Sequence, residues 1–391
     1  MTKIYFLSDS CLTCTGYATI TSNILNYLSE KGHECIHQAH NYVGQTIPPG
    51  FKFEDGRELK FKIMGTGKML YSQDLLVPRI RELKPDIFGV LLDSFMLYPW
   101  ILNLDFAPAK SIIYFPSDGG GGLPQFCENV LKKFNVKVAM SKYAQKQAFD
   151  LYGIKAEYIP HAIDTSNYYP IDEGRRKELR KKWGFQDKFV VGVVSRNQGR
   201  KMLDRMIKSF AIFAKNHPDA ILFMHLDPQD VSAVFDIKLL IQRHKIQNRC
   251  VFTGMKFYKG FDYKQMNEIY NLMDVFFLPT SGEGFGVPII EAMGCEVPCI
   301  VTDYTTTQEL LIENGQCGIP VPICTDWTGS WSVERGIMDI PKAVEALETL
   351  YNDKELRKKY GKVGREKVLK YYDWKIIGPQ WDNLINKMVN T

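Results

Sequence analysis

The sequence lacks any apolar run that approaches the roughly 18 consecutive residues of a membrane-spanning helix. Its first ten residues do not form a signal peptide, because their apolar run is short and polar residues follow it in place of a cleavage site. We therefore expect a cytoplasmic protein without a transmembrane segment.

A disulfide framework and a zinc motif are also missing, although the 391-residue chain contains nine cysteines. Cys11 and Cys14 have the spacing of a redox or metal-binding pair, but no second Cys/His pair at zinc spacing accompanies them. Reduced and mostly buried thiols in a cytosolic protein explain the cysteines better than metal or redox chemistry does.

A strong excess of one charge is absent as well, since 49 Lys and Arg oppose 44 Asp and Glu for a formal net charge of +5. Two stretches, 132–146 and 175–182, are more basic than the rest. Solvated helix faces are the simpler interpretation of such stretches. An anionic partner such as a lipid surface or nucleic acid is the alternative.

The chain is long enough for two domains. Apolar strand candidates alternate with helical segments in both halves, which predicts an α/β protein with parallel sheets covered by helices on both faces. Polar residues 165–170 are the expected linker. The predicted domains are 1–168 and 169–370, followed by a helical segment at 371–391. Two such halves would hold a ligand at the carboxyl ends of their strands.

The most informative segment, residues 275–294, reads VFFLPTSGEGFGVPIIEAMG. An apolar strand runs into a glycine-rich loop and then into a short helix with Pro288 in its first turn. The glycines allow close approach of the backbone to a ligand, and the N–H groups of such a loop suit an anion. Glu283 would be unfavourable beside a phosphate unless its carboxylate binds something else, such as sugar hydroxyls. The alternative is a tight strand-to-helix turn without a ligand.

Two cations follow the first strand of the second half. Arg196 would lie at the carboxyl end of strand 189–194, and Lys201 near the start of the next helix. A diphosphate suits this pair by charge and by hydrogen bonding. Charged loops after strands are often only solvated, so this pair alone is weak evidence.

Together these motifs resemble the signature of glycosyltransferase family 4, the retaining enzymes of the GT-B fold. Glu283 and Glu291 have its Glu-x7-Glu spacing, and Arg196 to Lys201 matches its Arg-x4-Lys element. Residues 159–164 resemble the hinge segment of the family. The likeness covers most of the second half well and the first half thinly. In detail, the surroundings of Arg196 look most like members from viruses, phages and archaea.

The resemblance implies two doubly wound, Rossmann-like domains that face each other across a cleft. The first would carry the acceptor and the second the nucleotide sugar, with the C-terminal helix crossing back to the first. Arg196 and Lys201 would hold the diphosphate, Glu283 the donor sugar hydroxyls and Glu291 the ribose. Further donor-site positions would be Gly16, Thr253, Gly254, Gly284, Phe285 and Gly286. Because preorganised hydrogen-bond donors can stabilise a leaving diphosphate, we predict an enzyme without metal or cofactor.

One position departs from the family pattern, in which a histidine follows a strand of the first domain. The matching stretch here is 114–122, where Asp118 is the only ionisable group at the strand's end. Asp118 either positions the acceptor or acts as a base, or else it caps the following helix. Asp93 has the same ambiguity. His161 is expected to form a hydrogen bond in the hinge.

The expected function is therefore retaining transfer of a hexose from a nucleotide diphosphate sugar of the GDP-mannose or UDP-glucose type. The acceptor would be a hydroxyl of a glycan, a lipid, a protein or a modified DNA base, and peripheral contact with an anionic membrane surface stays open. The alternatives are a nucleotide-sugar sensor without transferase activity and a nucleotide-sugar epimerase of the same fold.

Overall fold

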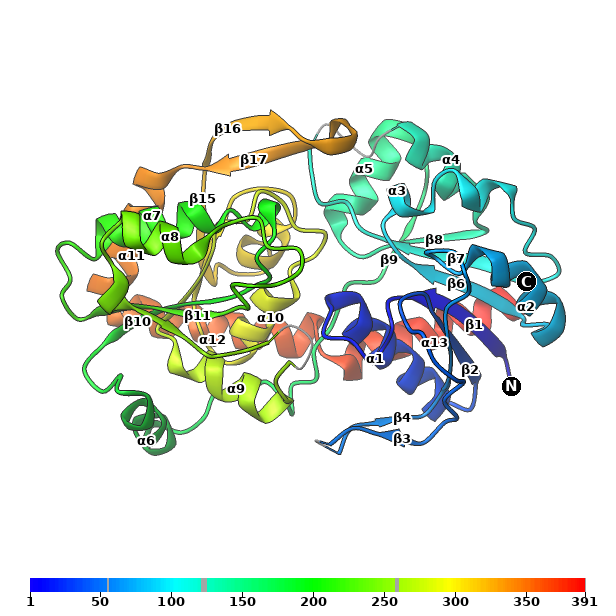
Figure 1. Cartoon of the computed structure of the whole chain (residues 1–391), viewed down its shortest axis with the longest axis horizontal. Helices are drawn as coiled ribbons and strands as arrows, with labels where there is room; N and C mark the ends of the chain where they lie inside the picture. Colours follow the sequence, from blue (N-terminus) through cyan, green and yellow to red (C-terminus); the bar gives the residue numbers. More distant parts are fainter. Residues whose placement is uncertain (55, 121–124, 257–259, 391) are drawn as a thin grey trace. The chain divides into compact units, whose positions relative to one another are not determined.

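The computed structural model describes residues 1–54, 56–120, 125–256 and 260–390. The chain divides into two compact units, each shown in Figure 1. Unit 1 comprises Met1–Ser117, Gly122–His161 and Trp374–Thr391, and unit 2 comprises Asp118–Gly121 and Ala162–Asp373. The domain ends predicted from the sequence lie a few residues away, after 168 and 370.

A parallel sheet forms the centre of unit 1, in the strand order β5-β2-β1-β6-β7-β8-β9. Its strands are apolar and largely buried, as expected for a sheet covered on both faces. The order reverses direction at β1, which is the doubly wound pattern. The strands are β1 (Lys3–Ser8), β2 (Glu34–Ala39), β5 (Lys62–Met64), β6 (Ile87–Leu91), β7 (Lys110–Phe115), β8 (Val136–Ala139) and β9 (Glu157–Tyr158).

Helices and a small hairpin complete unit 1. Those between the strands are α1 (Gly16–Glu30), α2 (Gln73–Leu83), α3 (Ser94–Leu97), η1 (Trp100–Asn103), α4 (Gln125–Lys133) and α5 (Lys142–Tyr152), and the hairpin pairs β3 (Phe51–Lys52) with β4 (Glu58–Leu59). The last helix, α13 (Trp374–Asn390), also belongs to unit 1. Its Trp381 packs edge-on against Tyr114 of β7, with ring centroids 4.9 Å apart. The C-terminal segment therefore returns to the first unit, as the resemblance implied.

Unit 2 is built around a second parallel sheet, in the order β12-β11-β10-β13-β14-β15. The strands are β10 (Phe189–Val194), β11 (Ala220–His225), β12 (Cys250–Phe252), β13 (Val275–Leu278), β14 (Cys299–Thr302) and β15 (Gly318–Val321). The helices are α6 (Glu173–Trp183), α7 (Leu203–Phe213), α8 (Ile237–Arg243), α9 (Tyr263–Leu272), α10 (Val287–Gly294), α11 (Ile340–Asn352) and α12 (Lys354–Tyr371). Short turns η2 (Gly199–Lys201), η3 (Gln247–Arg249), η4 (Gln308–Ile312) and η5 (Ser330–Ser332) connect them. The predicted α/β class with two Rossmann-like sheets is confirmed.

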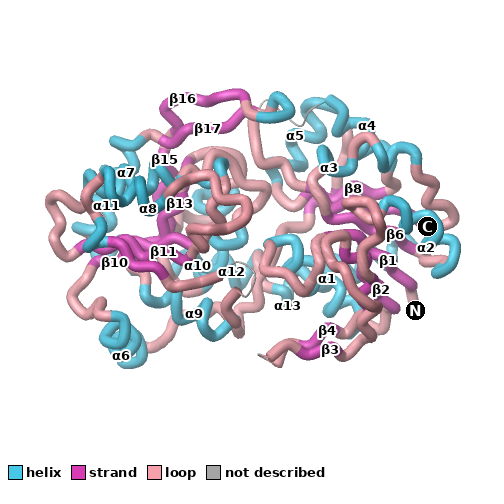
Figure 2. The backbone as a smooth tube through the Cα atoms, viewed as in Figure 1, coloured by secondary structure: helices cyan, strands magenta, loops and turns pink. Residues whose placement is uncertain are grey.

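An antiparallel hairpin of unit 2, β16 (Ile323–Thr328) and β17 (Glu334–Met338), lies outside this sheet. Figure 2 shows its two strands apart from the parallel sheet of the same unit. The sequence does not predict this hairpin, because most of β16 is exposed and carries no apolar alternation. The N–H of Gly336 in β17 donates to the carbonyl of Ser281, so the hairpin contacts the glycine-rich loop.

One of the two basic stretches has a structural task. Within α6, Arg176 and Arg180 both bind the carboxylate of Asp274, which precedes β13, at 3.0 and 2.5 Å. Burial acts to raise the pKa of Asp274, but the two arginines and a backbone hydrogen bond lower it below its usual value. Solvation alone therefore does not explain the stretch 175–182, since part of it attaches α6 to the sheet.

All nine cysteines are free thiols, and six of them, including Cys11, are buried. Burial raises the pKa of the Cys11 thiol well above its usual value, which suits a reduced, unreactive side chain. Among the helices in the described part of the chain, none is long and apolar enough to cross a bilayer.

Candidate donor site at the carboxyl edge of the second sheet

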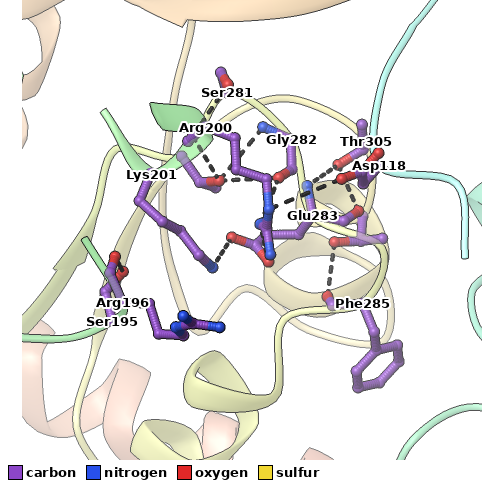
Figure 3. Close-up of polar contacts among 12 residues, drawn as sticks. Asp118, Ser195, Arg196, Arg200, Lys201, Ser281, Gly282, Glu283, Phe285 and Thr305 are labelled. Atoms are coloured by element: carbon purple, nitrogen blue, oxygen red, sulfur yellow. Dashed lines mark hydrogen bonds and ion pairs between the residues drawn. The ribbon is translucent and has the colours of Figure 1, made fainter. Parts of the chain in front are cut away.

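Two loops of unit 2 leave the same edge of its sheet. They follow β10 and β13, which are neighbouring parallel strands with Val191 paired to Val275. The backbone N–H of Ser281 in the second loop donates to the carbonyl of Arg200 in the first, at 2.7 Å. The loops 195–201 and 279–286 are thereby joined, as Figure 3 shows. Their joining brings together cations and a carboxylate that are far apart in sequence.

Glu283 is the centre of this cluster. Lys201 Nζ donates to its Oε1 at 2.5 Å, and Arg200 Nη1 lies 3.0 Å from its Oε2. The side chains of Lys201 and Glu283 are each only 7% exposed. Burial acts to raise the pKa of Glu283, but the charges of Arg200 and Lys201 prevail and hold the pKa at about 2. Burial lowers the pKa of Lys201 to about 8. Both groups are therefore charged at neutral pH.

Two glycines of the second loop are required by the fold itself, in addition to leaving room for a ligand. Gly282 has φ +154°, and a Cβ there would lie 1.9 Å from the backbone oxygen of Asp118. Gly286 precedes α10 with φ +107°, a left-handed conformation that favours glycine. Within the described residues, the N–H groups of Gly284 and Gly286 donate to no acceptor. Donors of this kind at the start of a helix suit an anion.

Threonines after β14 fix the shape of this loop. The N–H of Glu283 donates to Thr305 Oγ1, and that hydroxyl donates to the carbonyl of Glu283, both at 3.0 Å. The hydroxyl of Thr306 donates to the carbonyl of Phe285 at 2.8 Å. The sequence motifs do not include these threonines. The available signal was a run of three threonines, 305–307, just beyond a buried strand.

Arg196 is held by a different carboxylate. Its Nε and Nη2 each donate to Asp230 at 2.8 Å, and Nη2 also donates to Ser232 at 2.8 Å. Burial acts to raise the pKa of Asp230, yet hydrogen bonds from Arg196 and Ser232 bring it down to about 2. Figure 3 shows the Arg196 guanidinium and the Lys201 ammonium on the same side of the site. Each of the two cations predicted to hold a diphosphate therefore has an internal carboxylate partner.

Glu291 has very different neighbours. The hydroxyl of Tyr270 donates to its Oε2 at 2.6 Å, and Tyr168 also bonds it. Burial raises the pKa of Glu291 to about 7, and the two tyrosines only partly oppose this. These tyrosines were not foreseen, since they come from α9 and from the stretch that precedes α6.

Asp118 belongs to unit 2 and joins the charged cluster. Its Oδ1 lies 3.1 Å from Arg335 Nη2, and its Oδ2 lies 3.8 Å from Arg200 Nε. Asp93 belongs to unit 1, where Tyr17 donates to its Oδ1 at 3.0 Å. Of the two aspartates that the sequence left open, Asp118 is thus the one placed beside Glu283.

The remaining predicted positions lie at sheet edges. Thr253 and Gly254 follow β12, where the Thr253 hydroxyl is 3.0 Å from His225 Nδ1 and Gly254 has φ +76°. Gly16 is the first residue of α1 in unit 1, and a Cβ added there would meet nothing within 4 Å. Local packing therefore gives no reason for glycine at position 16. The expected contacts of these positions with a donor stay predictions.

His161 lies in the core of unit 1. Its Nδ1 is 2.6 Å from the hydroxyl of Tyr114, and burial lowers the pKa of His161 to about 3. The imidazole is therefore neutral and hydrogen-bonded, as predicted for the hinge.

The parallel sheets and their connections match solved structures over almost the whole chain. Sucrose-phosphate synthase from Thermosynechococcus elongatus aligns with a TM-score of 0.77 at 16% identity, over 99% of each chain. HepE from Anabaena, solved in complex with UDP-glucose, aligns with a TM-score of 0.74 at 16% identity, over 99% of this chain and 100% of that one. The chain thus has the GT-B fold.

Sequence comparison adds a family match for the second unit. Residues 175–367, which lie within unit 2, match the model of the glycosyl transferases group 1. The capsular polysaccharide biosynthesis glycosyltransferase CapM of Staphylococcus aureus is 27% identical over 278 residues, 65% of this chain and 66% of that protein. A GDP-mannose-dependent monoacylated α-(1-6)-phosphatidylinositol monomannoside mannosyltransferase of Corynebacterium glutamicum is 26% identical over 281 residues, 68% of this chain and 65% of that protein.

Mannosylfructose-phosphate synthase of Agrobacterium fabrum is 27% identical over 161 residues, 39% of this chain and 34% of that protein. The matches therefore span between about one third and two thirds of the length of these three relatives. The expected likeness to viral, phage and archaeal members stays a prediction.

Proposed function

We propose that this chain transfers a hexose from a nucleotide diphosphate sugar to an acceptor hydroxyl, with retention of configuration and without a metal ion. One observation carries the proposal: Glu283 is a buried carboxylate held ionised between Lys201 and Arg200. It lies on a loop that offers N–H groups at a helix start. A fixed carboxylate accepts hydrogen bonds from sugar hydroxyls, while the cations and N–H groups suit a diphosphate.

In this reaction the bond between the anomeric carbon and the diphosphate oxygen breaks, and its electron pair leaves with the nucleotide. The acceptor oxygen forms the new bond to that carbon and gives up its proton to an oxygen of the leaving diphosphate. Lys201 and the N–H groups of Gly284 and Gly286 would stabilise the charge that develops on the leaving diphosphate. Asp118 carries the second carboxylate of the cluster and would orient the acceptor hydroxyl.

Arg196 and Glu291 would bind the rest of the donor. Arg196 projects from the loop after β10 with its guanidinium oriented by Asp230, so a phosphate oxygen can approach a preorganised cation. Glu291 would accept from the ribose hydroxyls and share them with the hydroxyl of Tyr270. The mannosyltransferase relative depends on GDP-mannose and HepE binds UDP-glucose, so a GDP- or UDP-linked hexose is the proposed donor.

The proposed acceptor is a hydroxyl of a glycan or of a glycolipid. Support comes from the two relatives, because one acts in capsular polysaccharide synthesis and the other on a phosphatidylinositol mannoside. A protein or modified DNA acceptor has no such support.

A thermal-shift screen against GDP, UDP, ADP and their hexose conjugates tests the proposal. Ligand binding raises the melting temperature by mass action, so one nucleotide series should stand out. Slow hydrolysis of the matching nucleotide sugar should follow and should be unaffected by EDTA. Absence of any nucleotide shift would overturn the proposal. Binding without hydrolysis or transfer would instead assign the chain to the sensors.

A further inference from the structure

The hairpin β16–β17 supplies a residue to the charged cluster that no part of the signature includes. Arg335 is the second residue of β17. Its Nη2 lies 3.1 Å from Asp118 Oδ1, and its Nη1 donates to the backbone carbonyl of Asp118. One guanidinium thus binds both the side chain and the main chain of the same residue.

Asp118 is connected to Glu283 through Arg200. Its second oxygen lies 3.8 Å from Arg200 Nε, and Arg200 Nη1 lies 3.0 Å from Glu283 Oε2. Arg200 also donates to the carbonyl of Gly282 at 3.1 Å. Cations and carboxylates therefore alternate along one chain of contacts, from Arg335 through Asp118 and Arg200 to Glu283.

The backbone of β17 reinforces the arrangement on both sides. The N–H groups of Gly120 and Glu334 each donate to the other's carbonyl, at 2.9 and 3.0 Å. The N–H of Gly336 donates to the carbonyl of Ser281 in the signature loop at 3.2 Å. The strand is thus bonded both to the segment that carries Asp118 and to the loop that carries Glu283.

The backbone of Gly282 lies close to both Asp118 and Arg335. A Cβ at Gly282 would lie 1.9 Å from the carbonyl oxygen of Asp118 and 3.2 Å from Arg335 Nη1. The Arg335 side chain is 17% exposed, so its guanidinium is largely shielded from water. A planar fork can bind two acceptors in fixed directions, whereas the ammonium of lysine cannot reproduce that geometry.

We propose that Arg335 is a positioning residue for glycosyl transfer, which acts by holding Asp118 against Arg200 and so orients the carboxylates that face the donor sugar. The inference rests on the proposed function of the Glu283 site. It makes the hairpin a working part of the donor site, although the hairpin lies outside the parallel sheet. Arg335 itself needs no contact with the substrate.

A double-mutant cycle tests this dependence. Arg335→Met, Asp118→Asn and the double variant are compared with the wild type in hydrolysis and transfer of the nucleotide sugar selected by the thermal-shift screen. We expect Arg335→Met to lower kcat at least tenfold and to leave the melting-temperature shift by the free nucleoside diphosphate unchanged. If Arg335 acts through Asp118, the double variant loses no more activity than Asp118→Asn alone.

Arg335→Lys is the conservative variant, and Thr325→Ala on the exposed strand β16 is the matched control. We expect partial activity from Arg335→Lys and wild-type activity from Thr325→Ala. Losses that multiply in the double variant would overturn the inference, and so would full activity of Arg335→Met. Loss of the nucleoside diphosphate shift in both Arg335 variants would also overturn it, by assigning Arg335 to the stability of the unit. Failure of the wild type to bind any nucleotide would instead reject the proposed function.

Discussion

The two glutamates of the signature segment are eight positions apart, and both are buried, yet their surroundings differ in kind. Glu283 lies between two cations, and its pKa is about 2. Glu291 lies against Tyr270 and Tyr168, and burial raises its pKa to about 7. A shared motif therefore does not give its members a shared charge state, because each side chain takes its charge from the elements packed around it.

Replacing Glu283 with Gln should have the largest effect, because it should lower both the stability of the protein and the rate of hexose transfer. Lys201 would be left buried without a carboxylate, and removing one partner of a buried ion pair costs about 3–5 kcal/mol. Loss of a preorganised charged group should also lower hexose transfer by about 100-fold. Calorimetric melting and initial rates of product formation measure the two effects.

The paired variant Lys201→Met with Glu283→Gln is the control for this prediction. It removes both charges, so it should recover much of the lost stability while remaining inactive. A Glu283→Gln protein with wild-type melting temperature and wild-type rate would show that the ion pair has no role.

Glu291→Gln should give the opposite result for stability. The folded-state pKa of Glu291 is raised to about 7 from 4.5, so its favourable contribution is complete below pH 4.5 and is lost as the pH rises through 7. At pH 8 the buried carboxylate costs about 3 kcal/mol, since the pKa is raised from 4.5 to about 7, and the neutral amide avoids this cost. Chemical denaturation should therefore find Glu291→Gln more stable than wild type at pH 8 and not at pH 4. Equal differences at the two pH values would contradict the raised pKa.

Arg196→Lys should weaken binding of the nucleoside diphosphate while leaving both glutamates unchanged. The two hydrogen bonds to Asp230 require a guanidinium, and a lysine at 196 would lose that orientation. We expect the affinity for the nucleoside diphosphate to fall about tenfold, or about 1.4 kcal/mol. Titration calorimetry measures this, with Lys188→Arg on the same unit as an exposed control. Unchanged affinity would remove Arg196 from the diphosphate site.

Tyr270→Phe, which changes a tyrosine beside Glu291, should have the smallest effect on stability. It removes the O–H that donates to Glu291, and a hydrogen bond of this kind contributes about 1 kcal/mol. The pKa of Glu291 should rise further, so the stability loss should grow as the pH increases above neutrality. Denaturant titrations between pH 5 and pH 9 measure the trend, and a loss independent of pH would argue against a bond to the carboxyl group.

The sequence predicted the α/β class, the two sheets and the loops that carry Arg196, Lys201 and Glu283. These follow from local periodicity and from the position of loops after strands. It did not predict the partners that set the charge states, such as Asp230 for Arg196 and Tyr270 for Glu291. Those partners come from segments distant in sequence and meet only in the folded unit.

The hairpin shows the same limit more strongly. Arg335 binds Asp118 across 217 positions of sequence, and β16 is mostly exposed, so neither hydrophobic pattern nor spacing marks the hairpin as part of the site. The glycine at 282 was predicted to admit a ligand. The structure adds a close backbone approach by Asp118 as a further reason for that glycine.

The most direct test of the central claim compares the affinities of the nucleoside diphosphate and of its sugar conjugate, by calorimetry, in wild type, Glu283→Gln and Glu291→Gln. We expect the affinity contributed by the hexose to be lost in Glu283→Gln and kept in Glu291→Gln. We also expect only Glu291→Gln to weaken binding of the free nucleoside diphosphate. Equal losses in both variants for both ligands would contradict the separate tasks of the two glutamates.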